Sequence, residues 1–195
     1  METGKHKMDQ LLTEEQKQFR QSVRSFVEKE VIPAAQEMDE RGEFPRALFQ
    51  RCAANGYFAL RYPESVGGMD ADFLTYCLMM EEIARGSLSL GAVVAMQTLM
   101  GTDLVFRFGT DEHRQRLLAP ALRGEKIGAI AMTEPDFGSD LGGITTRAIQ
   151  KDGGWEIHGR KMWITSATVA DFFTVAAKTD PEAGFKGIDF FLEIG

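Results

Sequence analysis

The sequence predicts an α+β fold, in which an N-terminal all-α helical domain is followed by an antiparallel β domain. Apolar residues of the first half recur at helical spacing, whereas the second half holds short β-rich runs separated by turn residues. Strands and helices do not alternate along the chain, and this order is typical of segregated α and β layers rather than of a parallel α/β sheet. We therefore predict a helical domain over residues 1–125 and a β domain over residues 126–195.

The first predicted helix begins at a capping box. Thr13 and Gln16 are spaced so that each side chain can satisfy the other residue's free backbone amide. An apolar face follows at helical spacing, formed by Phe19, Val23, Phe26 and Val27. Pro33 lies near the expected end of this helix, and a second helix is expected to start at Pro45 and close at Asn55-Gly56.

A third helical region, from Ala71 to Phe108, is apolar on several faces, which predicts buried central helices. Its most apolar part, Leu88 to Met100, is interrupted by polar residues and falls short of the roughly 20 residues that a membrane span requires, so we expect no span. The acidic pair Glu81-Glu82 is expected to be solvated surface charge, because adjacent helix residues point in different directions.

Six short β-rich runs follow Glu125. They cover residues 126–133, 144–150, 155–158, 161–165, 172–178 and 188–194. Asp152-Gly153-Gly154 separates the second run from the third and is a strong hairpin signal. The turn chemistry between runs predicts an antiparallel arrangement.

Composition and charge exclude several classes of protein. An apolar fraction of 44% with 26% charged residues is typical of a globular protein, and a net charge of -7 argues against a non-specific nucleic-acid binder. Cys52 and Cys77 are expected to be core thiols in a reducing compartment. The N-terminus resembles neither a signal peptide nor a transit peptide, so the expected location is cytoplasmic, and the histidines show no metal-ligand spacing.

Two motifs carry the chemistry of the β half. The stretch from Ala131 to Asp140 follows an apolar run and contains Thr133, Pro135, Gly138 and Ser139 in one tight turn. About thirty residues later, Lys161-Met162-Trp163-Ile164-Thr165 presents an indole and a second hydroxyl. Taken alone, the first motif is more often a plain turn, and an indole is more often a core residue than the wall of a cofactor site. No G-x-G-x-x-G turn is present, so nicotinamide binding is not indicated.

MTEPDFGSD followed by KMWIT resembles the pair of flavin-binding signatures of the acyl-CoA dehydrogenase family. MEEIARGSLSL and the long run from FGTDEHRQRLL to the first motif follow the same order. The resemblance implies an N-terminal helical domain, a middle β-barrel-like domain and a C-terminal helical domain. The sequence stops at Gly195, inside the expected barrel, so we expect the C-terminal domain and its catalytic glutamate to be missing and assign no catalytic residue.

The same resemblance implies roles for individual residues. The expected FAD contacts are Ile130, Met132, Thr133, Gly138, Ser139, Trp163, Ile164 and Thr165. Ser139 is also expected near the acyl-CoA, and Met96 beside its acyl chain. Ser166-Ala167 departs from the Asn-Gly that many relatives carry after Trp-Ile-Thr. Basic residues on the β-runs, including Arg160 and Lys161, are left unassigned because such residues commonly face solvent.

The resemblance therefore implies an FAD-dependent acyl-CoA dehydrogenase of fatty acid metabolism, which desaturates an acyl-CoA thioester and passes electrons to an electron-transfer acceptor. The full-length protein is expected to be a homo-oligomer, and the chain alone is expected to be inactive. Two alternatives stay open: a flavin monooxygenase or oxidase of the same fold, and a non-catalytic truncated module for binding or assembly.

Overall fold

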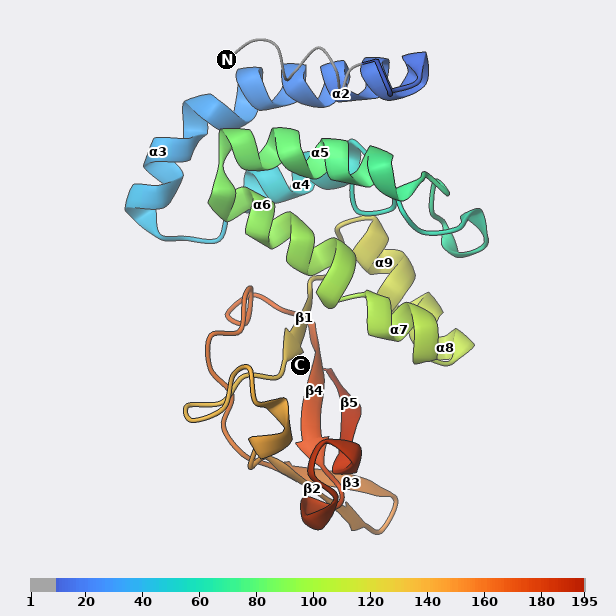
Figure 1. Cartoon of the computed structure of the whole chain (residues 1–195), viewed down its shortest axis with the longest axis vertical. Coiled ribbons are helices and arrows are strands. Elements are labelled where there is room, and N and C mark those ends of the chain that lie inside the picture. The colour runs from blue at the N-terminus through green and yellow to red at the C-terminus, as the bar shows by residue number, and fades with distance from the viewer. Residues whose placement is uncertain (1–9, 195) are drawn as a thin grey trace. The chain divides into compact units, whose positions relative to one another are not determined.

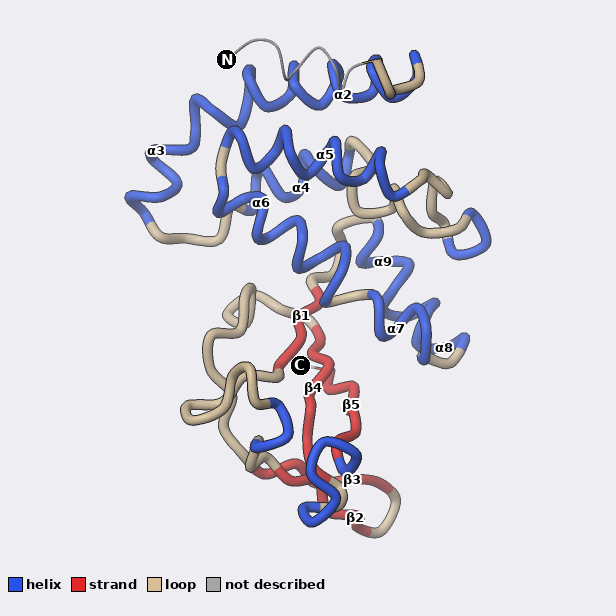
Figure 2. The backbone as a smooth tube through the Cα atoms, in the orientation of Figure 1, coloured by secondary structure: helices blue, strands red, loops and turns tan. Residues whose placement is uncertain are grey.

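The computed structural model describes residues 10–194 and divides into two compact units. One unit covers Met1–Ala95 with Leu122–Gly124, and we call it the helical unit; the other covers Met96–Ala121 with Glu125–Gly195, and we call it the sheet unit. In Figure 1 the labelled strands carry the yellow to red colours of the second part of the chain, and Figure 2 distinguishes helices from strands. The predicted order of a helical part followed by a β part is confirmed.

The helical unit is built from helices that pack through apolar faces. Its elements are α2 (Glu14–Phe26), the π-helix η1 (Val27–Val31), α3 (Ile32–Arg41), α4 (Arg46–Ala54), the 3₁₀-helix η2 (Glu64–Val66), α5 (Phe73–Gly86) and α6 (Leu88–Ala95). The capping box at Thr13 and Gln16 is confirmed, with both reciprocal hydrogen bonds at 3.1 Å. Val23, Phe49 and Met79 are fully buried in the core of this unit.

The sequence predicts that the first helix ends near Pro33, but the helical backbone continues past this residue. The backbone continues through the π-helix η1 into α3, and Pro33 lies in the first turn of α3. A proline is tolerated there because the first turn of a helix leaves its backbone N–H groups without intrahelical partners. The predicted helix after Pro45 is confirmed and ends at Ala54, with Asn55 as its C-cap and Gly56 next at a φ of 75°.

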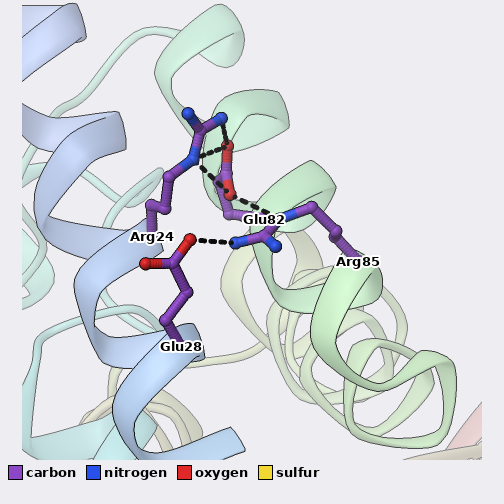
Figure 3. Close-up of polar contacts among 4 residues, drawn as sticks. All are labelled: Arg24, Glu28, Glu82 and Arg85. Carbon is purple, nitrogen blue, oxygen red and sulfur yellow. Dashed lines mark hydrogen bonds and ion pairs between the residues drawn. The ribbon is translucent and has the colours of Figure 1, made fainter. Parts of the chain in front are cut away.

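Glu82 is buried, which corrects the expectation that the Glu81-Glu82 pair is solvated; Glu81 alone is exposed. Arg24 of α2 donates to Glu82 from Nε at 3.1 Å, and Arg85 donates from its own Nε at 3.0 Å (Figure 3). Arg85 also reaches Glu28 at 3.4 Å. These contacts join α2 and η1 to α5 and neutralise a carboxylate that lies at 2% exposure.

The two cysteines differ from each other. Cys52 is buried on α4, and burial raises the pKa of its thiol to about 12. Cys77 on α5 is exposed, so the prediction of two core thiols is wrong for this residue. Its position lies on the outer face of an amphipathic helix, which its apolar sequence neighbours concealed.

The sheet unit begins with short helical segments. They are η3 (Met96–Met100), α7 (Asp103–Phe108), α8 (Asp111–His113), η4 (Arg114–Leu118) and α9 (Ala119–Leu122). The buried amide of Gln97 donates to the carbonyl oxygens of Ala121 and Lys126 at 2.9 and 2.8 Å and accepts from the amide of Gly128 at 3.2 Å. One side chain thus ties η3 to the start of the first strand.

Helical residues Leu88–Phe108 form one stretch of 21 residues, longer than the apolar segment recognised in the sequence. Within the described residues, this stretch alone is long and apolar enough to cross a membrane, with a mean hydropathy of 1.4. Half of that apolar window is buried inside the protein, and core helices of soluble proteins meet the same criterion.

Within residues 10–194, the strands form one five-stranded mixed sheet. They are β1 (Gly128–Ala131), β2 (Arg147–Lys151), β3 (Gly154–His158), β4 (Phe172–Lys178) and β5 (Ile188–Ile194), in the order β1-β4-β2-β3 with β5 also paired to β4. The predicted hairpin is confirmed: β2 and β3 are antiparallel, and Gly153 takes a φ of 88° at the turn. Gly128 lies against Gly101, where an added Cβ would approach the Gly101 carbonyl oxygen to 2.5 Å.

Two details of the predicted β domain need correction. The pairs β2–β3 and β4–β5 are antiparallel, but β1–β4 and β2–β4 are parallel. Parallel pairing requires a long connection that returns the chain in the same direction, and the segment from Ala131 to Phe172 provides it. In addition, residues 161–165 form no strand, since Trp163 has a φ of 58°, which is incompatible with extended backbone.

Candidate functional site

The two sequence motifs form two adjacent loops of the sheet unit. The first motif loop, residues 132–140, follows β1, and the second motif loop, residues 161–166, follows β3. The amide of Met162 donates a hydrogen bond of 3.0 Å to the carbonyl oxygen of Thr133. The prediction that the two motifs lie side by side is therefore confirmed, although the second motif reaches this position as a loop.

Glu134 ties the first motif loop to Thr145, Thr146 and Lys161. Its side chain is 2% exposed and accepts five hydrogen bonds, from the amide and hydroxyl of Thr145, the amide and hydroxyl of Thr146, and Nζ of Lys161. Burial alone would raise the pKa of Glu134, but the hydrogen bonds from Thr146, Thr145 and Lys161 outweigh burial and lower the pKa to about 2. The carboxylate is therefore ionised at any ordinary pH.

Lys161 joins the two loops. Its Nζ donates to Oε1 of Glu134 at 2.9 Å and to the carbonyl oxygen of Met132 at 3.0 Å. Only 11% of the lysine side chain is exposed. The two acceptors stand on either side of Thr133, so Lys161 fixes the backbone that carries the Thr133 hydroxyl.

Gly159 permits the close approach of the chain that leads into the second motif loop. A Cβ added there would lie 2.2 Å from Oγ1 of Thr146 and 2.7 Å from its Cα. Because a backbone atom lies in the way, no larger residue fits without displacing Thr146. Glycine at this position thus allows the 145–146 segment and the second motif loop to meet at Glu134.

Trp163 extends from the second motif loop as an exposed platform. Its side chain is 82% exposed, and its φ of 58° is an outlier for a bulky residue. Backbone strain of this kind is typical of functional sites, where surrounding contacts hold the conformation. Trp163, Ile164 and Thr165 line an open cavity of about 510 Å³ together with Lys161 and Met162.

A second cavity lies against the sheet. It measures about 720 Å³, and Ile164 and Lys161 line both cavities. Its other walls include Ala131 at the end of β1 and Phe173 and Val175 of β4. The second motif loop therefore contributes Lys161 and Ile164 to the walls of both cavities.

The remaining predicted residues lie as follows. Ile130 is half-buried in β1 and Met132 is half-buried at the start of the first motif loop, while Gly138 and Ser139 are exposed in that loop. Within the described part of the chain, the hydroxyls of Thr133, Ser139 and Thr165 make no hydrogen bond, which leaves them available to a ligand. Met96 is buried in η3 and lines neither of these cavities, so its predicted contact with the acyl chain stays a prediction.

Sequence reasoning missed Glu134 and Lys161 as the residues that hold this arrangement. The sequence leaves Lys161 among the unassigned basic residues, because basic residues on strands commonly face solvent. Both residues belong to the quoted motifs, but no spacing rule links a glutamate to a lysine across 27 residues.

Comparison with known proteins identifies the family. Residues 13–125 match the family model of the acyl-CoA dehydrogenase N-terminal domain, and residues 129–192 match that of the acyl-CoA dehydrogenase middle domain. The chain is 50% identical over 175 residues to benzylmalonyl-CoA dehydrogenase of Aromatoleum aromaticum, which covers 90% of this chain and 46% of that protein. It is 40% identical over 181 residues to 3-(aryl)acrylate reductase of Clostridium sporogenes, with 92% and 48% coverage.

Solved structures give the same result. An acyl-CoA dehydrogenase from Geobacillus kaustophilus superposes with a TM-score of 0.88 at 34% identity, covering 94% of this chain and 48% of that chain. A structure described as the FAD complex of PigA superposes with a TM-score of 0.87 at 30% identity, covering 94% and 49%. The chain spans about half the length of the relatives it matches. On the two matched domains and these superpositions, this chain belongs to the acyl-CoA dehydrogenase family.

Proposed function

We propose that the two motif loops bind FAD and that the protein takes part in the α,β-desaturation of an acyl-CoA thioester. The observation that carries the proposal is the exposed indole of Trp163, held at a φ of 58° beside the Thr133 loop. A large flat side chain left in solvent at the cost of backbone strain suits a flat aromatic ligand. Membership of the acyl-CoA dehydrogenase family and an FAD-containing structural neighbour support the same choice of cofactor.

The residues present fit such a cofactor. Trp163 would pack against the ring system, and the free hydroxyls of Thr133 and Thr165 would donate to its polar edge. Gly138 and Ser139 would lie along the phosphate chain, where small residues with exposed backbone allow close approach. When bound, FAD supplies the hydride acceptor of the reaction, and the protein supplies binding and orientation.

Glu134 is not the catalytic base in this proposal. A carboxylate offers about four lone-pair sites, and Glu134 already accepts five hydrogen bonds from protein donors. Its pKa of about 2 also makes it a poor acceptor for a proton. We therefore assign no catalytic base within these residues and give Glu134 a role in holding the loops.

The substrate and partners follow from the same proposal. An acyl-CoA thioester would approach Ser139, and the electron-transfer acceptor would reoxidise the flavin. Met96 is retained as a candidate contact for the acyl chain, and homo-oligomerisation is proposed for the full-length protein. Two similar relatives are named for aryl or benzyl compounds, so aromatic acyl groups belong in the substrate panel.

A direct test is retention of flavin. The purified protein is incubated with FAD and passed through a gel-filtration column, and the flavin absorbance of the protein peak is measured. We expect FAD to co-elute with the wild-type protein and to be lost from a Trp163→Ala variant with an unchanged circular dichroism spectrum. Absence of FAD from folded wild-type protein at saturating concentrations contradicts the proposal.

A further inference from the structure

We propose that Lys161 and Glu134 act as a clamp, defined as these two residues with the carbonyl of Met132, which sets the position of Trp163 relative to Thr133. The inference rests on the proposed FAD site, because the clamp matters for function only if Trp163 and Thr133 contact the same ligand. Its residues are positioning residues rather than catalytic ones, since they touch the loops and not the reacting atoms.

The clamp holds the first motif loop from both sides of Thr133. Lys161 donates to the Met132 carbonyl at 3.0 Å and to Oε1 of Glu134 at 2.9 Å. The intervening residue, Thr133, has its own carbonyl held by the amide of Met162 at 3.0 Å. Three consecutive residues of the first loop are thus fixed by two consecutive residues of the second.

The clamp also determines where the indole stands. Trp163 follows Met162 directly, and its left-handed backbone is not favoured by its own side chain. Such a conformation persists only where neighbouring contacts over-determine it. Lys161 and Met162 directly precede Trp163 in the chain, and both hydrogen-bond to the first motif loop. These contacts hold the backbone that leads into Trp163.

Glu134 is itself fixed, so that the clamp has a rigid base. Four of its five hydrogen bonds come from Thr145 and Thr146, the residues that lead into β2. Thr146 continues the connection to the sheet, because its carbonyl accepts from the amide of Lys178 at 2.8 Å. Both loops are therefore held in place by contacts that lead to the strands, as well as by their contacts with each other.

A lysine suits this position better than an arginine. The ammonium group is compact and can donate in separate directions to a carbonyl and to a carboxylate, whereas a planar guanidinium donates from a wide fork. Lys161 meets its two acceptors at 3.0 and 2.9 Å from a single nitrogen, an arrangement that the fork of an arginine does not reproduce. Glu134 remains hydrogen-bonded by the two threonines when Lys161 is removed, so removal loosens the loop contact before it unfolds the sheet.

The test compares Lys161→Met with Arg160→Met in the 195-residue chain, each in a Trp155→Phe background that leaves Trp163 as the single tryptophan of these residues. Arg160 is exposed, adjacent in sequence and equally charged, so it is a matched control. Three properties are measured: hydrogen exchange of the Met162 amide, fluorescence anisotropy of Trp163, and the dissociation constant for FAD.

For Lys161→Met we expect faster exchange at Met162, lower anisotropy of Trp163, and FAD binding weakened about tenfold, because the two residues that contact the ligand are no longer held in place. For Arg160→Met we expect no change in any of the three. Unchanged exchange and anisotropy in folded Lys161→Met would overturn the clamp.

Two further outcomes remain decisive. If wild-type protein binds no FAD, the proposed function fails, while exchange and anisotropy still decide the clamp. If Lys161→Met does not fold, Thr145→Ala is used, which removes one hydroxyl donor to Glu134 and keeps the amide donor. The clamp then predicts that the Met162 amide exchanges faster in Thr145→Ala than in the wild type. An unchanged exchange rate overturns the clamp.

Discussion

Oε1 of Glu134 accepts a hydrogen bond of 2.9 Å from Nζ of Lys161, although 27 residues separate the two in the sequence. This contact brings together the two motifs on which the functional assignment depends. It is buried, with side-chain exposures of 2% and 11%. Its consequences for stability and ligand binding can be measured independently of catalysis.

The pH dependence of stability reports the environment of Glu134. Its pKa falls from 4.5 to about 2 on folding, so its stabilisation is fully present above pH 4.5 and is lost as the pH falls through about 2. A shift of this size corresponds to at most about 3 kcal/mol of unfolding free energy, taken at 1.36 kcal/mol per unit. Urea denaturation at pH 7 and pH 3 measures the part of this loss that falls between pH 4.5 and pH 3. In Glu134→Gln the difference between the two pH values is expected to shrink, and an equal difference in both proteins would refute the assignment.

Gly159→Ala is expected to destabilise the sheet unit. The new Cβ would lie 2.2 Å from Oγ1 of Thr146 and 2.7 Å from its Cα, which forces the backbone to move. We expect a loss of about 2 kcal/mol, typical of overpacking at a tight site. Gly154→Ala on β3 is the matched control, because nothing lies within 4 Å of the added methyl group there. Thermal denaturation compares the two, and equal melting temperatures would show that the approach at Gly159 is not tight.

Ser166→Asn is expected to stabilise the second motif loop. Ser166 has a φ of 66°, and asparagine tolerates this left-handed conformation better than serine. The expected gain is about 0.5 kcal/mol, at the lower end of backbone-conformation effects. Ser166→Ala serves as the control, since alanine keeps the Cβ and offers no local hydrogen bond. A gain in Ser166→Ala equal to that in Ser166→Asn would argue against a conformational origin.

Glu82→Gln should destabilise the helical unit while Glu81→Gln should not. Glu82 pairs with Arg24 and Arg85 at 2% exposure, and its removal leaves both guanidinium groups without that carboxylate. Because both arginines are partly exposed, we expect about 2 kcal/mol rather than the 3–5 kcal/mol of a fully buried broken pair. Urea denaturation at low ionic strength measures the difference in unfolding free energy between the two variants. Equal unfolding free energies for the two variants would mean that solvent screens the network.

The sequence predicted those features of the fold that depend on local chemistry. The capping box at Thr13 and the hairpin at Gly153 both arise from residues close in the chain, and both are present. Parallel pairing of β1 with β4 was not predictable, because it depends on how a connection of about forty residues returns to the sheet. The exposure of Cys77 likewise depends on which helix face the rest of the unit covers.

For the site, the two motifs were predicted to meet and they do, through Met162 and Thr133. The strand expected at residues 161–165 was wrong, because β-rich composition does not reveal the positive φ of Trp163. The largely buried position of Lys161, at 11% exposure, was also missed, since a lysine beside an arginine normally indicates a solvated surface. Tertiary contacts, rather than local propensity, decide both features.

The most direct test of the account is a titration of FAD into the Trp155→Phe protein, in which Trp163 is the remaining tryptophan. If Trp163 forms a wall of the flavin site, its fluorescence falls in a saturable manner, and the fractional fall is larger than that of Trp155 in the Trp163→Phe protein. Saturable quenching of Trp155 alone, or no quenching of Trp163 in folded protein, would contradict the placement of FAD between the two motif loops.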